Sequence, residues 1–290
     1  MGKMNRKHKY IGTLLLIVLT LGSACAAPVQ QINRKLPELE KLPTQFNFVV
    51  LGDNRSGDEV YRNLISMAME QKPDFIINTG DQIETPGNRE QWANFWELSK
   101  VVTVPYFLTV GNHDSHPKVM GSERAYKEQV DLPLYYSFTA GNSLFIVLDS
   151  YIGGEEKKIT GKQFKWLEGA LANSKAKHKF VFLHHPLYTD TEQGIGRHVG
   201  SCLDKFPEDR DRLQALFVTW KVTMVFAGHE HFYLRKTVDG IPHVITGGGG
   251  ATLYAKDEDG GFYHYIFVNV DGDKVNAEVV DINGKIRDKF

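Results

Sequence analysis

Cysteine is scarce in this chain, and the two cysteines present do not suggest a disulfide. Of the 290 residues only Cys25 and Cys202 carry a thiol, and Cys25 lies in a segment that we expect to be cleaved off or lipidated. The mature chain therefore has no structural disulfide, which excludes the disulfide-stabilised folds of small exported domains. We assign Cys202 no role. With 42% hydrophobic and 24% charged residues, the composition is that of an ordinary folded protein.

Acidic residues are absent before Glu38, and the apolar run in that region is too short to span a membrane. The run covers Ile11–Leu21, whereas a membrane-spanning helix needs about 20 apolar residues. A basic start, a short apolar run and then small residues are typical of a secretory signal peptide. We therefore expect residues 1–26 to direct export to the bacterial periplasm or the extracellular space. The basic residues of this start are Lys3, Arg6, Lys7 and Lys9.

Two processing patterns fit the end of this segment. Ala24-Cys25-Ala26 matches the small-residue cleavage site that releases a soluble protein. Leu21–Cys25 also resembles a bacterial lipobox, in which Cys25 would carry a lipid, although Gly22 stands where the usual lipobox has leucine. We favour the soluble form, and a lipid on Cys25 is the only membrane contact that we expect. Residues 27–44 then read as a proline-punctuated linker, and residues 45–290 as one domain.

The domain also lacks any excess of positive charge. The whole chain has 34 Lys and Arg against 35 Asp and Glu, and four of those cations lie in the expected signal peptide. The mature chain is therefore mildly acidic. Such a surface has no electrostatic reason to bind a nucleic acid polymer, so we exclude that class of partner.

Residues 45–290 alternate between short apolar strands and amphipathic helices, with hairpins towards the end. This order predicts an α/β fold with mixed sheets. Thr160 and Gln163 have the spacing of a helix capping box. Helices are expected around Val60–Ala68, Asn88–Ser99, after Thr160 and over Glu208–Thr219. Strands are expected over Phe46–Leu51, Phe75–Asn78, Tyr106–Val110, Tyr135–Phe138, Leu144–Leu148, Phe180–Leu183, Val222–Ala227, Ile241–Thr246, Tyr263–Val270 and Lys274–Val280.

Five of these strands end in potential metal ligands. Each such segment alone could be a turn or a helix cap, but the carboxyl ends of neighbouring strands line one crevice in an open α/β sheet. Asp, Asn and His side chains suit Zn, Mn or Fe. The joint pattern therefore predicts a metal site at the carboxyl-end rim of the strands. The segments are Gly52-Asp53, Gly80-Asp81, Gly111-Asn112-His113-Asp114, His184-His185 and Gly228-His229-Glu230-His231.

Together these segments resemble the five motifs of the calcineurin-like metallophosphoesterases, and His184–Tyr188 is close to the form seen in purple acid phosphatases and bacterial phosphodiesterases. The resemblance implies a four-layer αββα sandwich and a dinuclear centre of divalent or trivalent ions such as Fe, Mn or Zn. By motif, Asp81 bridges both ions, and His113 lies beside the phosphoryl group as an acid or charge stabiliser. Asn112 contacts both metal and substrate. The full set of implied ligands is Asp53, Asp81, Asn112, His184, His229 and His231.

Such a centre implies hydrolysis of small phosphomonoesters or phosphodiesters by metal-activated water, because two ions clamp the phosphoryl group and no Ser or Cys nucleophile is needed. The alternative is a non-catalytic metal-binding envelope protein that retains the fold. The two hypotheses predict different metal contents, with two ions per chain expected of the hydrolase.

One motif departs from the family pattern. The first motif commonly reads Asp-x-His, and here it reads Asp53-Asn54-Arg55. Because arginine does not ligate a cation, one site loses an imidazole. Glu84, three residues after Asp81, is a candidate substitute at a position where purple acid phosphatases carry a tyrosine ligand, so we expect no iron–tyrosinate colour. Arg55 either holds a phosphate oxygen or pairs with Glu84 or Asp58 at the surface.

Other segments near the motifs give weaker predictions. His185 should point away from His184 if the strand continues, and it then serves either beside a ligand or against substrate. Gly247–Gly250 is expected to be a tight turn that lets the backbone approach the site. Thr189–Asp204 is either a substrate-facing loop or an ordinary surface loop. His116, His198 and His243 receive no role.

Overall fold

The computed structural model describes residues 38–130, 132–190 and 200–290. The expected signal peptide with Cys25, most of the linker, His198 and the middle of the Thr189–Asp204 loop lie outside the described residues. Within the described ranges, no helix has the length and apolar character needed to cross a membrane.

Two mixed sheets of six strands form the centre of the domain, in the orders β12-β11-β10-β1-β2-β3 and β4-β5-β6-β7-β9-β8. Strands β1, β2 and β3 are parallel, as are β5, β6, β7 and β9. The first sheet consists of β1 (Gln45–Leu51), β2 (Phe75–Asn78), β3 (Tyr106–Leu108), β10 (His264–Asp271), β11 (Lys274–Asp281) and β12 (Ile286–Lys289). The second consists of β4 (Tyr136–Ala140), β5 (Ser143–Val147), β6 (His178–Leu183), β7 (Met224–Ala227), β8 (Tyr233–Val238) and β9 (Ile241–Thr246).

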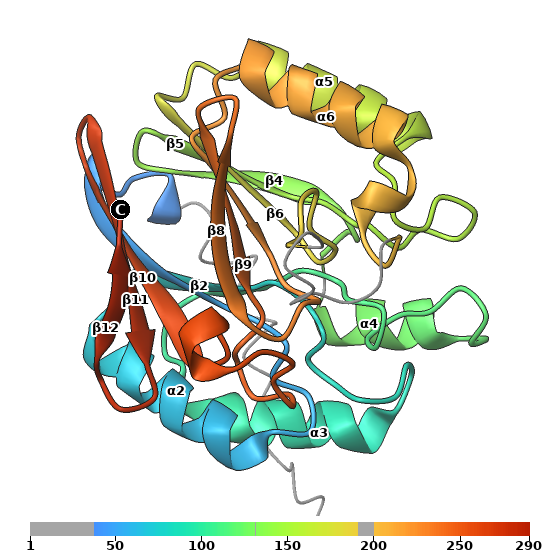
Figure 1. Cartoon of the computed structure of the whole chain (residues 1–290), viewed down its shortest axis with the longest axis vertical. Helices are drawn as coiled ribbons and strands as arrows, with labels where there is room; N and C mark the ends of the chain where they lie inside the picture. Colours follow the sequence, from blue (N-terminus) through green and yellow to red (C-terminus); the bar gives the residue numbers. More distant parts are fainter. Residues whose placement is uncertain (1–37, 131, 191–199) are drawn as a thin grey trace, which may run out of the picture.

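Helices cover the outer faces of both sheets. The helices α2 (Asp58–Glu70) and α3 (Arg89–Leu98) lie on the first sheet, and α5 (Gly161–Asn173) and α6 (Pro207–Thr219) lie on the second (Figure 1). The remaining helix α4 (Ser122–Val130) follows β3. The prediction of a four-layer αββα sandwich with two mixed sheets is therefore confirmed.

An aromatic core joins the two sheets. The ring of Phe48 on β1 stacks on Phe75 of β2 at 5.4 Å and meets Phe145 of β5 and Phe180 of β6 edge-on, each at 5.2 Å. All four rings are fully buried. Edge-to-face pairs add about 0.5–1.5 kcal/mol each beyond the burial of their area. This packing fixes the parallel strands of both sheets side by side, so that their carboxyl ends share one rim.

The start of helix α5 and the glycine segment Gly247–Gly250 differ in how well the sequence predicts them. The capping box at Thr160 is wrong, because its hydroxyl donates to Glu155 and Gln163 instead bonds the backbone N–H and C=O of buried Asp149. The close approach of Gly247–Gly250 is confirmed, since Gly249 N–H donates to Gly52 O at 2.9 Å and a Cβ on Gly249 would lie 2.2 Å from that oxygen. Helix α4 and strands β8 and β12 were not anticipated.

Candidate metal centre

Left-handed backbone turns direct three side chains back over the rim. Asp53, Asp81 and His229 follow strands β1, β2 and β7 and have φ angles of 57°, 57° and 70°. For residues other than glycine this conformation costs on the order of 1–3 kcal/mol and persists only where the surroundings impose it. The glycines before the motifs make room for the carboxylates. A Cβ on Gly111 would lie 2.2 Å from Asp81 Oδ1, and one on Gly228 would lie 2.4 Å from Asp53 Oδ2.

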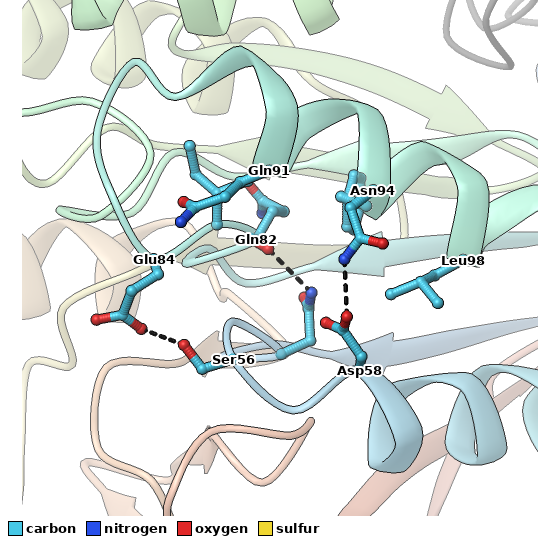
Figure 2. Close-up of a pocket in the computed structure, with 10 residues that line it drawn as sticks. Ser56, Asp58, Gln82, Glu84, Gln91, Asn94 and Leu98 are labelled. Carbon is cyan, nitrogen blue, oxygen red and sulfur yellow. Dashed lines mark hydrogen bonds between the residues drawn. The ribbon is translucent and has the colours of Figure 1, made fainter.

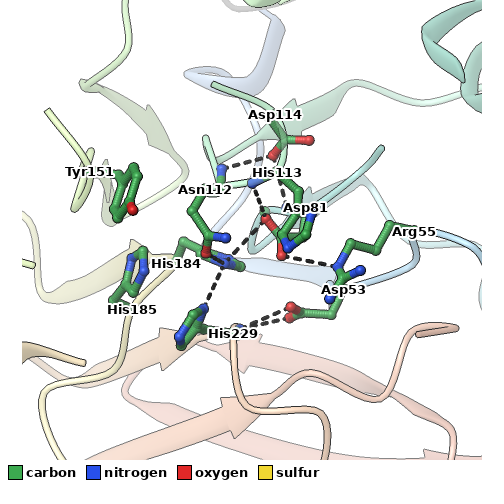
Figure 3. A network of polar contacts seen from close by, with 12 residues as sticks. Asp53, Arg55, Asp81, Asn112, His113, Asp114, Tyr151, His184, His185 and His229 are labelled. Atoms are coloured by element: carbon green, nitrogen blue, oxygen red, sulfur yellow. Dashed lines mark hydrogen bonds and ion pairs between the residues drawn. The ribbon is translucent and has the colours of Figure 1, made fainter. Parts of the chain in front are cut away.

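Four donor atoms converge at one position, which we call site A and define by Asp81, Asn112, His184 and His229 (Figure 3). Asn112 Oδ1, Asp81 Oδ1 and His229 Nδ1 lie 3.2, 3.3 and 3.3 Å from His184 Nε2. Ligands that share one metal through bonds of about 2.1 Å lie roughly 3.0–3.4 Å apart. The donor set and its spacing therefore fit a single cation.

The hydrogen bonding of His184 also indicates a cation at site A. Its Nδ1 lies 2.9 Å from Thr79 O and donates to it, which leaves a lone pair on Nε2 in the neutral ring. That lone pair faces two oxygen acceptors, Asp81 Oδ1 and Asn112 Oδ1. Only a proton or a metal ion relieves this repulsion.

In the metal-free chain a proton fills that role. Burial favours the neutral form of His184, but the adjacent Asp81 outweighs it and raises the pKa of His184 to about 9. Burial acts in the opposite sense on Asp81, yet His184 and His113 hold the pKa of that carboxyl well below its usual range. A metal at site A therefore has to displace one proton from His184 at neutral pH.

A second position, site B, is defined by Asp53, His231 and the other oxygen of Asp81. His231 Nδ1 lies 2.8 Å from Thr252 O, and its Nε2 lies 3.4 Å from Asp53 Oδ1. The third oxygen, Asp81 Oδ2, faces Arg55 Nε at 3.3 Å. Site B therefore offers three metal donors, and a guanidinium lies beside them.

The Arg55 side chain lies between the carboxylates of Asp81 and Glu84 and is largely shielded from solvent. This side chain is only 12% exposed, and it ion-pairs with Glu84 as well as Asp81. Glu84 also accepts from Ser56, so the structure commits this carboxylate to Arg55 rather than offering it to a metal. The pairing with Asp58 is not observed, because Asp58 accepts from Asn94 instead. The expected pairing of Arg55 with Glu84 is therefore observed. It does not lie at the surface as expected, because the Arg55 side chain is largely buried.

His113 lies beside Asp81 (Figure 3). Its backbone N–H donates to Asp81 Oδ1 at 2.9 Å, and its Nδ1 lies 2.6 Å from the backbone O of Glu84. The side chain is 25% exposed. With Nδ1 bonded to a carbonyl, Nε2 is the ring atom left to exchange a proton with a ligand in the cleft.

Comparison with known proteins agrees with this geometry. Residues 46–233 match the calcineurin-like phosphoesterases as a family. The chain belongs to this family.

Individual members are related only distantly. Purple acid phosphatase 23 of Arabidopsis thaliana is 30% identical over 192 residues, which cover 59% of this chain and 39% of that protein. A probable glycerophosphodiester phosphodiesterase of Arcobacter nitrofigilis is 31% identical over 175 residues, covering 56% and 58%. The structure of a purple acid phosphatase from yellow lupin, Lupinus luteus, superposes with a TM-score of 0.68 at 18% identity, covering 86% and 54%. The chain thus spans about half the length of these relatives.

Within this calcineurin-like fold, the buried carboxylate of Asp114 hydrogen-bonds to the backbone of the two loops that follow β2 and β3. Asp114 accepts the backbone N–H groups of Asp81, Gln82 and Gly111 at 2.8 Å and that of Ile83 at 3.2 Å. The loops after β2 and β3 are therefore fixed relative to each other. Asp114 thus positions ligands of site A.

His185 does not point away from the ligands, as the continued strand would require. Strand β6 ends at Leu183, so the alternation of side chains no longer applies, and the His185 ring lies 4.2 Å from that of His229. Its Nδ1 lies 2.9 Å from Ser150 Oγ, and its ring stacks on Tyr151 at 5.1 Å. His185 therefore packs against His229, a candidate ligand of site A (Figure 3).

Sequence reasoning missed the residues on which His185 packs. Strand β5 ends at Val147, and after Leu148 come Asp149, Ser150 and Tyr151, so this strand end is a sixth one at which polar residues follow an apolar strand. Tyr151 also reaches towards His116, with 3.3 Å between its hydroxyl and Nε2. Cys202, to which no role was given, is buried and donates to Glu230 at 3.4 Å.

His243, another histidine to which no role was given, is structural. His243 is buried on β9, and its Nε2 lies 3.0 Å from Gln214 Oε1 on α6. Burial lowers its pKa to about 4. His243 therefore stays neutral within the second sheet and its helix layer.

A polar cavity of about 210 Å³ lies between α3 and the loop before α2 (Figure 2). Glu84 and Asp58 contribute carboxylates to its wall, Gln91 and Asn94 contribute amides, and its lining includes no basic residue from the described part of the chain. An acidic wall repels phosphate. This cavity therefore does not suit a phosphoryl group.

Proposed function

We propose that this chain is an exported, metal-dependent phosphoesterase that hydrolyses phosphomonoesters or small phosphodiesters. One observation carries the proposal: four donor atoms at site A lie at metal-ligand spacing beside two groups suited to phosphate, Arg55 and His113. The family relationship supports hydrolysis of phosphoric esters. Because the match covers only 39% and 58% of these two relatives, their activity is transferred here as a proposal only.

The donor set of site A, with two imidazoles, a carboxylate and an amide oxygen, fits Fe, Mn or Zn. When bound, such an ion supplies Lewis acidity, which polarises the phosphoryl group and lowers the pKa of water so that no phosphoenzyme is needed. A second ion, as in the dinuclear centres typical of this family, would have Asp53, Asp81 and His231 of site B as its candidate ligands.

The chain's own residues bind the phosphoryl group and handle the proton. The Arg55 guanidinium lies beside Asp81, where its planar fork can hold phosphoryl oxygens. His113 in its protonated form can give the Nε2 proton to the leaving oxygen while Nδ1 stays on Glu84 O. The buried Cys202 offers no competing nucleophile, because burial and Glu230 raise the pKa of its thiol.

A second function remains a candidate on one observation. The ion pair between Arg55 and Asp81 places a cation where a metal ligand is expected, which fits a non-catalytic metal-binding envelope protein that retains the fold. Against it stand His113 and the ordered contacts of its ring and backbone, which a pure binder does not need.

The test is hydrolysis of p-nitrophenyl phosphate and bis-p-nitrophenyl phosphate by the secreted, purified chain in Mn, Zn, Fe or Mg. Asp81→Asn and His113→Ala should abolish turnover, whereas Asp273→Asn, on the exposed side chain paired with Lys177, should leave it unchanged. Preference for one ester identifies the substrate class. Absence of metal-dependent turnover with these and with natural monoesters and diesters, in a folded protein, would refute the proposal and favour the binding function.

A further inference from the structure

The guanidinium of Arg55 is built into the floor of site B. The backbone N–H of Arg55 donates to the backbone O of Asp81 at 3.1 Å. In its side chain, Nε lies 3.3 Å from Asp81 Oδ2, and Nη1 pairs with Glu84. Ser56 fixes Glu84 from the other side. A hydrogen bond to Glu84 therefore fixes the Nη1 end of the guanidinium, and the ion pair with Asp81 lies at the Nε end.

The donors present at site B do not fit a tightly held metal ion. Catalytic zinc sites use three protein ligands and a water, and here Asp53, His231 and one oxygen of Asp81 supply only that minimum. That Asp81 oxygen already faces Arg55. Arginine has no lone pair to offer a metal and does not lose its proton in proteins.

The charges of the side chains around sites A and B also sum to zero with one divalent metal ion. Asp53, Asp81 and Glu84 carry three negative charges, which one divalent ion at site A and the Arg55 guanidinium neutralise. A second divalent ion would leave two uncompensated positive charges around Asp53 and Asp81, both of which are almost fully buried. Uncompensated buried charge is strongly unfavourable.

We propose that this chain binds one metal ion tightly, at site A, and that Arg55 takes the place of the second ion. The guanidinium provides the second positive group of the centre, and its fork suits the oxygens of a phosphoryl group. The inference rests on the proposed phosphoesterase function for the role of Arg55 towards substrate. The metal count itself stands independently of catalysis.

The test counts metal ions per folded chain. The purified protein is stripped with a chelator, dialysed against Mn²⁺ and measured by elemental mass spectrometry, with electron paramagnetic resonance to separate isolated from coupled Mn²⁺. We expect one isolated ion in the wild-type chain. Arg55→His restores an imidazole and should give two coupled ions, whereas Arg55→Lys keeps the positive charge and should stay at one.

Ligand variants in the wild-type background keep the test decisive if Arg55→His does not fold. His231→Ala should retain the single ion, because His231 belongs to site B, and Asn112→Ala should bind it at least tenfold more weakly. Two ions of similar affinity in the wild-type chain, or loss of the single ion in His231→Ala, would overturn the inference.

This count separates the two proposals. Hydrolysis by a chain that holds two ions overturns the role of Arg55 and leaves the phosphoesterase function intact. A single ion at site A without hydrolysis of any phosphoester overturns the function and leaves the metal count intact.

Discussion

Asp114 holds Asp81 by its backbone: Asp114 Oδ2 accepts the N–H of Asp81 at 2.8 Å and also that of Gly111 at 2.8 Å. The other oxygen, Oδ1, accepts from Gln82 and Ile83. The Asp114 side chain is fully buried. One side chain thus holds the backbone of the residue shared by sites A and B, which has a left-handed φ of 57°.

Asp114→Asn should lower the free energy of unfolding by about 2–4 kcal/mol, because an amide NH₂ would face two N–H donors and leave them unsatisfied inside the protein. Urea unfolding of the metal-free chain measures this loss. The matched control is Asp273→Asn, whose side chain is 80% exposed and which should change stability by less than about 0.5 kcal/mol. Equal stability of both variants would contradict the role assigned to Asp114.

Arg55→Ala should act mainly on substrate binding. Loss of a charge-assisted contact to a phosphoryl oxygen costs about 1.5–3 kcal/mol, so we expect KM to rise about 10- to 100-fold, with a smaller change in kcat. Steady-state kinetics with p-nitrophenyl phosphate measures both constants. Glu84→Gln removes the ion pair but leaves the guanidinium, and should raise KM less. An unchanged KM in Arg55→Ala removes Arg55 from the substrate site.

Much of the fold and of the site could be predicted because the strands are short and apolar and end abruptly. Five such ends carry Gly, Asp, Asn or His, and the parallel order of β1, β2 and β3 and of β5, β6, β7 and β9 brings strand ends to one rim. Local sequence is informative here because a buried strand requires apolar residues and the turn after it requires glycine or a polar residue. Two of the glycines in this pattern, Gly111 and Gly228, leave room that the carboxylates of Asp81 and Asp53 fill.

The rest depends on contacts between distant segments. Thr160 and Gln163 have capping-box spacing, but buried Asp149 offers Gln163 better backbone partners. The direction of His185 follows from where β6 ends and from the hydroxyl of Ser150, 35 residues away. Arg55 left two alternatives open, and only the positions of Asp81 and Glu84 show how its guanidinium lies. No pattern in the sequence encodes these pairings.

Metal binding at site A should release a proton from His184. In the metal-free chain the pKa of His184 is raised to about 9, so the ring is protonated below that pH, and the ion must displace the proton to reach Nε2. The apparent affinity should therefore rise about tenfold per pH unit up to about pH 9 and level off above it. Calorimetry in buffers of different ionisation enthalpy counts the protons.

Asn112→Ala provides the control for this pH dependence. Asn112 does not titrate, so its loss should weaken binding at every pH while the release of one proton per ion persists. A metal affinity that stays constant from about pH 7 to about pH 9 would contradict the protonated state of His184 in the metal-free chain.

Export makes a separate prediction about the N-terminus. Cleavage after Ala26 should give a soluble chain that begins at Ala27, which mass spectrometry of the secreted protein identifies. Cys25→Ala keeps a small residue at the middle of the site and should leave cleavage unchanged. A chain that begins with lipid-modified Cys25 and sediments with membranes would instead support the lipobox pattern, and Cys25→Ala would then block its processing.

Tyr151 should support metal binding through its stacking on His185. The two rings lie 5.1 Å apart and nearly parallel, at 9°, and His185 in turn packs on the ligand His229. Residues that orient metal ligands change metal affinity by about 10- to 100-fold when lost, so Tyr151→Ala should weaken binding at site A about tenfold. Tyr151→Phe keeps the ring and loses only the hydroxyl contact to His116, so its affinity should stay near that of the wild type. Equal weakening in both variants would show that the hydroxyl, not the stacked ring, supports the centre.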